Sequence, residues 1–128
     1  MKKTRKEEAK EKKKSGKYNC AEAVICTYAD KMNLDESKTC CLGCALGLGM
    51  GNMEGTCGAL TGAGIVLGMC VKEKALAKQK MREIMEKFQT RNGATQCKIL
   101  KGTETKKVLR DCVDCVGDAV EFLEEALK

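Results

Sequence analysis

Sulfur is the main chemical resource of this chain, which has ten cysteines and no histidine among its 128 residues. Two cysteine pairs have CxxC spacing, Cys41 with Cys44 and Cys112 with Cys115. Thiolates attack disulfides, and they bind zinc or the iron of iron–sulfur clusters. The lack of histidine excludes His-ligated metal sites, Ser-His-Asp triads and Cys-His protease pairs. The residue types therefore favour redox or metal chemistry at sulfur.

Cys57 stands where its thiol should be activated. A glycine-rich stretch at 47–55 gives way to an uncharged apolar run at 57–71, and Thr56 between them predicts a helix N-cap. Cys57 would then be the first helical residue, facing unpaired backbone N–H groups and the positive end of the helix dipole. Both features favour the thiolate, so the sequence predicts a primed cysteine at the start of a buried helix.

Three more cysteines occupy defined points on other predicted elements. Cys20 lies near the start of a helix predicted over 18–32, and Cys97 lies in the first turn of a short element that follows residue 95. Cys112 points inward from a last helix predicted over 105–127. Together with Cys57, these residues offer thiols from four separate elements.

Some of the other cysteines are expected to be core residues rather than functional ones, because a free thiol packs well as a small core side chain. That role is predicted for Cys26 and Cys70. We therefore expect Cys57→Ser to do more damage than Cys26→Ser. For the cluster between the first two helices, a core role and a functional role weigh equally: Cys40, Cys41 and Cys44.

The elements that must position these thiols are helical. Apolar residues recur at helical spacing over 18–32, 72–91 and 105–127, and no useful run alternates with the period of a strand. In the run 57–71, glycines four residues apart let another backbone approach closely. We expect an all-α fold, a compact bundle of five or six helices around this central glycine-rich buried helix. At about 15 residues the run is shorter than the roughly 20 needed to cross a bilayer, so no membrane span is expected.

The charge divides the chain into two parts. Residues 1–17 hold nine Lys or Arg and three Glu, which accounts for the whole net charge of +6. We expect a basic N-terminal arm or frayed helix at 1–17 and a single cysteine-rich helical domain at 18–128. The neutral body argues against a nucleic-acid partner. The N-terminus lacks the apolar core of a signal peptide, which predicts a cytoplasmic protein with few structural disulfides.

Several motifs occur in an order that is similar to a known family. They are NCAEAV at 19–24, the glycine loop ending in GMG at 49–51, TCGALTGA at 56–63, CKILKG at 97–102 and CVDCVGDA at 112–119. Over most of 18–119 the chain resembles the C_GCAxxG_C_C family of redox-active proteins of bacteria and archaea. The resemblance implies an electron-transfer role with redox partner proteins. It also implies four family cysteines, the last one being Cys112 rather than Cys115: Cys20, Cys57, Cys97 and Cys112.

Four hypotheses follow for function. The first is an iron–sulfur protein, with a [2Fe–2S] centre bound by Cys20, Cys57, Cys97 and Cys112. The second is a thiol–disulfide oxidoreductase or redox sensor, in which Cys57 attacks and another of these four resolves. The third is a structural zinc protein with the same ligands. The fourth is a binding module that acts through residues 1–17. Exposed glycine-rich apolar surface could also pair two chains in a homodimer.

Overall fold

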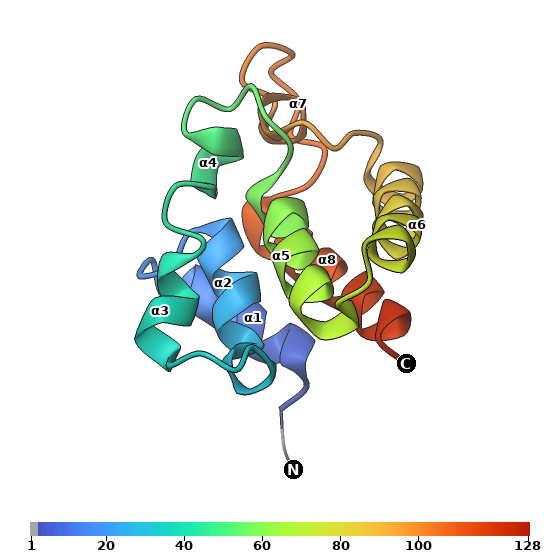
Figure 1. The fold of residues 1–128 in the computed structure, drawn as a ribbon. Helices are drawn as coiled ribbons and strands as arrows, with labels where there is room; N and C mark the ends of the chain where they lie inside the picture. The colour runs from blue at the N-terminus through green and yellow to red at the C-terminus, as the bar shows by residue number, and fades with distance from the viewer. Residues whose placement is uncertain (1–2) are drawn as a thin grey trace.

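A computed structural model describes residues 3–128, which fold into eight α-helices and one short 3₁₀ helix with α5 at the centre (Figure 1). Among these residues the only strand-like pairing is one isolated bridge between Thr56 and Gln96, which confirms the all-α class. Three of the helices are six residues or shorter, so the count exceeds the five or six expected. The bounds are α1 Arg5–Lys14, α2 Cys20–Thr27, η1 Ala29–Lys31, α3 Glu36–Cys41, α4 Gly47–Met50, α5 Gly58–Val71, α6 Lys74–Asn92, α7 Cys97–Lys101 and α8 Cys112–Ala126.

The central helix packs tightly on α2 because its glycines leave room for the other backbone. A Cβ added at Gly62 would lie 2.9 Å from the carbonyl oxygen of Ala21, and one at Gly58 would lie 3.3 Å from the amide nitrogen of Ala21. Real Cβ atoms essentially never approach backbone so closely as the first of these distances. The two helices can therefore approach backbone to backbone only with glycine at this contact.

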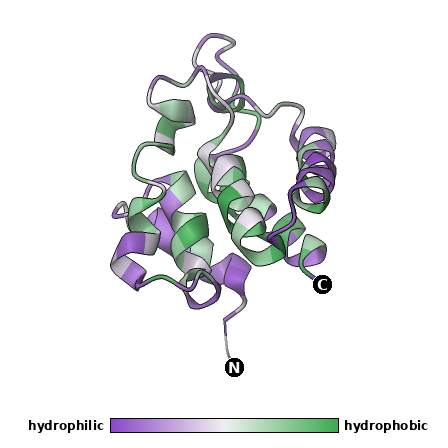
Figure 2. Cartoon of the chain, in the orientation of Figure 1, coloured by the Kyte–Doolittle hydropathy of each residue, from purple (hydrophilic) through white to green (hydrophobic). Residues whose placement is uncertain are grey.

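The core is mostly aliphatic, with Tyr28, Phe88 and Phe122 as its aromatic members, and lies where α2, α5, α6 and α8 face one another. The apolar stripe predicted on the first helix is fully buried from Ala21 through Val24 to Met32. On α6 the buried positions are Ile84 and Phe88, and the outward faces of that helix are hydrophilic (Figure 2). The predicted core position Leu76 on the same helix is instead 41% exposed, since the stripe faces the core only from the second turn onward.

The first basic segment is a packed helix over Arg5–Lys14 rather than a solvated arm. Ala9 is fully buried, and Gly117 of α8 lets the aliphatic part of Lys10 lie close to the α8 backbone. Arg5 and Lys6 form ion pairs with acidic residues of other elements, namely Asp30, Glu121 and Glu124. The composition of this segment shows its charge but not its packing. The packing leaves no apolar stripe in the sequence, because the helix buries only one small side chain.

The central and the last helix begin at residues other than those predicted. The central helix begins at Gly58, so that Cys57 itself, rather than Thr56, is the N-cap. The last helix begins at Cys112 instead of Thr105, because the Asp111 carboxylate accepts a hydrogen bond from the Asp114 amide and caps the helix there. Val108, expected on the buried stripe, is therefore 61% exposed. In residues 3–128 there is no helix with the length and apolar character that crossing a bilayer requires.

Two glycine substitutions on α5 should have opposite effects on stability. Gly62→Ala should lower the free energy of unfolding by about 1–3 kcal/mol, because the new methyl group meets the α2 backbone. Gly68→Ala is the matched control, since a Cβ there meets nothing within 4 Å. It should raise stability by about 0.5–1 kcal/mol through helix propensity. Urea unfolding monitored by circular dichroism measures both, and equal effects would contradict the packing described.

Candidate thiol site

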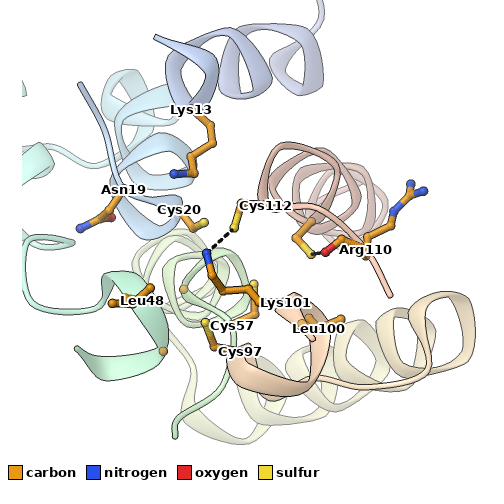
Figure 3. Close-up of a pocket in the computed structure, with 13 residues that line it drawn as sticks. Lys13, Asn19, Cys20, Leu48, Cys57, Cys97, Leu100, Lys101, Arg110 and Cys112 are labelled. Atoms are coloured by element: carbon orange, nitrogen blue, oxygen red, sulfur yellow. Dashed lines mark hydrogen bonds between the residues drawn. The ribbon is translucent and has the colours of Figure 1, made fainter. Parts of the chain in front are cut away.

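A cavity of about 140 Å³ lies at the amino end of α5, between that helix, α2, α7 and α8. Figure 3 draws the residues that line it, which come from these four helices, from α1 and from the segment of α4. The labelled cysteines and Lys101 lie around the central space, whereas the Asn19 and Arg110 side chains point away from it. All four cysteines singled out in the sequence line this cavity, together with a fifth that the family resemblance left aside. The lining cysteines are Cys20, Cys57, Cys97, Cys112 and Cys115.

Each of the four cysteines that we singled out stands at the start of a helix. Cys20 is the first residue of α2, whose N-cap Asn19 forms a capping box with Glu22. Cys97 and Cys112 are the first residues of α7 and α8, and Cys57 is the N-cap of α5. Because a helix carries partial positive charge at its amino end, this placement puts positive dipole ends around the cavity.

The segments that carry Cys57 and Cys97 are tied to each other by backbone hydrogen bonds. The amide of Cys57 donates to the carbonyl of Thr95 at 2.8 Å, and the amide of Cys97 donates to the carbonyl of Gly55 at 3.0 Å. These bonds flank the isolated bridge between Thr56 and Gln96. Residues about 40 positions apart in the sequence are thereby held in register, which no local sequence pattern could indicate.

The glycine loop before α5 closes one side of the cavity. Leu48, Gly49 and Met50 have φ of 55°, 54° and 67°, in the left-handed region. A Cβ at Gly49 would lie 2.5 Å from the Cβ of Cys97 and 2.9 Å from the carbonyl oxygen of Gly55. Glycine at this position therefore lets the loop close down on Cys97. Left-handed backbone at three successive residues, two of them with side chains, is typical of a functional loop.

The Cys112 thiol is activated by its neighbours. Its pKa falls to about 5, first because of a hydrogen bond from the Cys20 thiol and then because of the positive charges of Lys101 and Lys13, against the opposing effect of burial. The Nζ of Lys101 lies 3.5 Å from the Cys112 Sγ, as the dashed line in Figure 3 marks. The pKa of Cys20 is raised in turn, by its hydrogen bond to Cys112 and by burial. Cys112 is therefore a thiolate at neutral pH, with Cys20 as a thiol beside it.

Cys57 and Cys115 form a second pair of this kind. A hydrogen bond from Cys115 lowers the pKa of Cys57, and the backbone N–H groups of Ala59 and Leu60 lower it further against the effect of burial. The pKa of Cys115 is raised by the same hydrogen bond and by burial. The activation expected of Cys57 from its place at a helix start thus has a second source, a neighbouring thiol that we did not identify from the sequence.

Lys101 should help to hold the pKa of Cys112 low. In the reduced, metal-free chain, alkylation of Cys112 by iodoacetamide should be nearly constant above about pH 6 and fall as the pH drops below about 5, where the thiolate is protonated. Lys101→Met removes a stabilising charge, so its midpoint should lie at higher pH. Peptide mapping across pH measures both. Lys98→Met is the control, because Lys98 pairs with Glu54 and Glu104; an equal shift in the two variants would contradict the assignment.

A buried ion cluster next to the cavity was not evident from the sequence. Asp118 of α8 is fully buried, and its carboxylate accepts hydrogen bonds from Arg110 at 2.9 and 3.1 Å, from Arg91 at 2.9 Å and from Asn92 at 3.1 Å. Arg110 lines the cavity, and its carbonyl accepts from the Cys115 thiol at 3.8 Å. The only sequence signal was a lone acidic residue within the apolar stripe of the last helix.

The remaining cysteines lie away from the cavity. Cys26 and Cys40 form a disulfide with a Cα–Cα distance of 5.1 Å. Cys26 is buried, as predicted for a core residue, although it is bonded rather than free. Cys41 and Cys44 are free and exposed, and Cys70 is free and half-buried.

The residues that line the cavity fit a thiolate-bound metal group. Its donors are all thiols, which suit iron–sulfur clusters and zinc. Within residues 3–128, however, no three Cys, Asp or Glu side chains meet at one point where a single ion could sit. The thiols are instead arranged around a space, with two close pairs on its rim.

Comparison with known proteins gives one match. The model of the family described as "Putative redox-active protein (C_GCAxxG_C_C)" matches residues 18–126. No curated protein and no solved structure matches the chain significantly. The matched stretch contains all five cavity cysteines and Asp118. The chain therefore belongs to the C_GCAxxG_C_C family of redox-active proteins.

Proposed function

We propose that the chain binds a [2Fe–2S] cluster in this cavity and transfers electrons to and from redox partner proteins. The proposal depends on one observation: five thiols from distant parts of the sequence line a single cavity. The lowered pKa of two of them, Cys57 and Cys112, adds to it. Four thiolates complete such a cluster without a histidine. The proposed ligands are Cys20, Cys57, Cys97 and Cys112.

The arrangement of the thiols supports a centre with two irons. Each iron of a [2Fe–2S] cluster takes two protein ligands, whereas structural zinc needs four donors around one point. The Cys20 and Cys112 thiols lie close together and would hold one iron. The other iron would take Cys57 and Cys97, whose segments are joined by backbone hydrogen bonds and whose side chains line the same cavity. Zinc as an alternative gains less support, since no such point exists among residues 3–128.

Cys115 is proposed as a hydrogen-bond donor rather than a ligand. It shares α8 with Cys112, and its thiol lies beside the Cys57 sulfur and 3.8 Å from the carbonyl oxygen of Arg110, either of which can accept its single proton. Hydrogen bonds to ligand sulfurs are one of the means by which proteins set the potential of a cluster. Losing Cys115 should therefore shift the potential while leaving the metal content unchanged.

The chain's own residues prepare the cavity for a negatively charged group. Lys13 and Lys101 lie beside the thiols, and helix amino ends surround them, which offsets the charge of thiolates in a confined space. Leu48 and Leu100 line the cavity and limit the entry of water. When bound, the cluster would supply a one-electron carrier, and the protein would hold, shield and tune it.

Metal analysis of protein purified without oxygen tests this proposal. We expect about two iron and two inorganic sulfide ions per chain, with visible absorbance that decreases on reduction by dithionite. Reconstitution of the metal-free chain with ferrous iron and sulfide should give the same content. A chain that stays free of iron after both procedures, or that holds one zinc ion and shows no redox response, overturns the proposal.

A thiol–disulfide oxidoreductase or redox sensor is the second candidate, favoured by the two thiol–thiolate pairs. In that reaction Cys57 attacks a substrate disulfide and releases one substrate thiolate. A neighbouring thiolate then attacks Cys57 and releases the second. The structure places Cys115 next to Cys57, in addition to the resolving residues considered from the sequence. Differential alkylation of metal-free protein cycled with dithiothreitol and its oxidised form identifies any bridge within the cavity.

A further inference from the structure

A second group of cysteines lies on the surface, where α3 passes into the glycine loop. Cys41 ends α3, and Cys44 follows one turn later, its amide donating to the carbonyl of Cys41 at 3.1 Å. An i to i+3 hydrogen bond of this kind defines a turn whose end Cα atoms are within about 7 Å, the reach of a disulfide. Both thiols are free and exposed, in contrast to those of the cavity.

The turn is fixed against α2 at both ends. Before it, the disulfide between Cys26 and Cys40 anchors the end of α3 to α2. Within it, the carbonyl of Gly43 accepts a hydrogen bond from the Asn19 side chain at 3.0 Å. A Cβ on Gly43 would lie 2.8 Å from the amide of Glu22, so the turn is seated directly on the start of α2. Because Cys40 is held toward α2, its neighbour Cys41 is presented to solvent.

The two thiols differ in their surroundings. The Cys44 thiol lies 3.7 Å from a carboxylate oxygen of Glu22, to which it donates. The other oxygen of Glu22 accepts from the Asn19 amide in the capping box, so this carboxylate is held in place. Burial, the Cys41 thiol and the Glu22 carboxylate raise the pKa of Cys44. Cys41 has no such acceptor beside it and is the more available nucleophile.

We propose that Cys41 and Cys44 form a second redox site, an exposed dithiol that reduces disulfides of low molecular weight or on protein surfaces. The Cys41 thiolate attacks one sulfur of the substrate, the substrate S–S bond breaks, and the first substrate thiolate leaves. The Cys44 thiol, held by Glu22, then gives its proton to that thiolate, and its sulfur attacks the Sγ of Cys41 and expels the second substrate thiolate, which takes from solvent the proton that Cys41 released. The substrate gains two electrons and two protons, and the protein gains a Cys41–Cys44 disulfide.

Glutathione disulfide is a suitable probe for this reaction. Incubated with it anaerobically, the full chain should release about two glutathione molecules for each Cys41–Cys44 bridge formed, as peptide mapping identifies. Cys44→Ser should stop at the first step and retain one glutathione on Cys41. The double variant C41S/C44S should lose the reaction, and Cys70→Ser, which removes another free thiol away from the cavity, should behave as the parent chain.

Two results would overturn this inference. One is a double variant that reacts with glutathione disulfide as the parent does, or a bridge that maps to other cysteines. The other is loss of iron and sulfide from the double variant, which would make these residues cluster ligands. The outcome is separate from that of the proposed cluster, because the dithiol reaction is expected whether or not the cavity binds iron.

Discussion

Replacing Cys57 with serine should abolish cluster binding, with the iron and sulfide content falling to the level of a blank. Cys57 lies at the bottom of the cavity, at the N-cap of the central helix, and only 5% of its surface is exposed. A serine hydroxyl there is not ionised at neutral pH and is a poor ligand for iron, so the cluster would lack one of its four ligands. Iron and sulfide analysis, together with the visible spectrum after anaerobic reconstitution, measures the effect.

Two control variants define what this result means. Cys70→Ser removes a thiol from the other end of the same helix and should keep the full iron content. Cys26→Ser opens the disulfide to Cys40, which spans 14 residues, and should lower stability by about 3 kcal/mol on the chain-entropy estimate. It should leave the iron content unchanged. If Cys57→Ser and Cys26→Ser lost iron equally, Cys57 would not be a ligand.

Replacing Asp118 with alanine should cost about 3 kcal/mol of stability, because it leaves Arg91, Arg110 and Asn92 without their shared acceptor. The arginines are partly exposed, which places the effect at the lower end of the range for broken buried pairs. Urea unfolding gives the free energy. The shape of the cavity should also change, because Arg110 lines it and would no longer be held by Asp118.

Glu125→Ala is the matched control for Asp118→Ala on the same helix. Glu125 pairs with Lys87, and both side chains are about half exposed, so its loss should cost no more than about 1 kcal/mol. A small effect of Asp118→Ala, similar to that of Glu125→Ala, would show that the buried carboxylate does not organise this end of α8. Retained stability with altered thiol reactivity would point instead to a role confined to the cavity.

The sequence predicted those parts of the fold that depend on local pattern. The buried stripe from Ala21 to Met32 follows from periodicity and is present. The glycine-rich run is a helix, as predicted, but it is buried only in part, because Gly64 and Ile65 are half-buried and Gly68 is exposed. The start of the last helix was misplaced by seven residues, because Val108 and Leu109 continue the apolar spacing while the cap at Asp111 ends it. A helix can begin at a capping residue inside a longer apolar pattern, so the pattern alone does not locate the first residue of the helix.

The candidate site was predictable in its residue types and less so in its contacts. Cys20, Cys57 and Cys97 could be singled out by their places near helix starts, Cys112 by its inward position on the last helix, and all four by the family motifs; they share a cavity. Three contacts depend instead on how distant helices pack. They are the pairing of Cys57 with Cys115, the approach of lysines to Cys112, and the disulfide between Cys26 and Cys40. Such contacts arise from tertiary structure, which the spacing of residues along one helix does not encode.

The position of α1 has a consequence for how the site is assembled. Every cavity thiol lies within the stretch that the family model matches, whereas Lys13 belongs to the helix that precedes it. Part of the positive charge beside the thiols therefore comes from outside the matched stretch. A change confined to the first seventeen residues could retune the affinity of the sulfurs for protons or for electrons without altering any of the sulfur atoms.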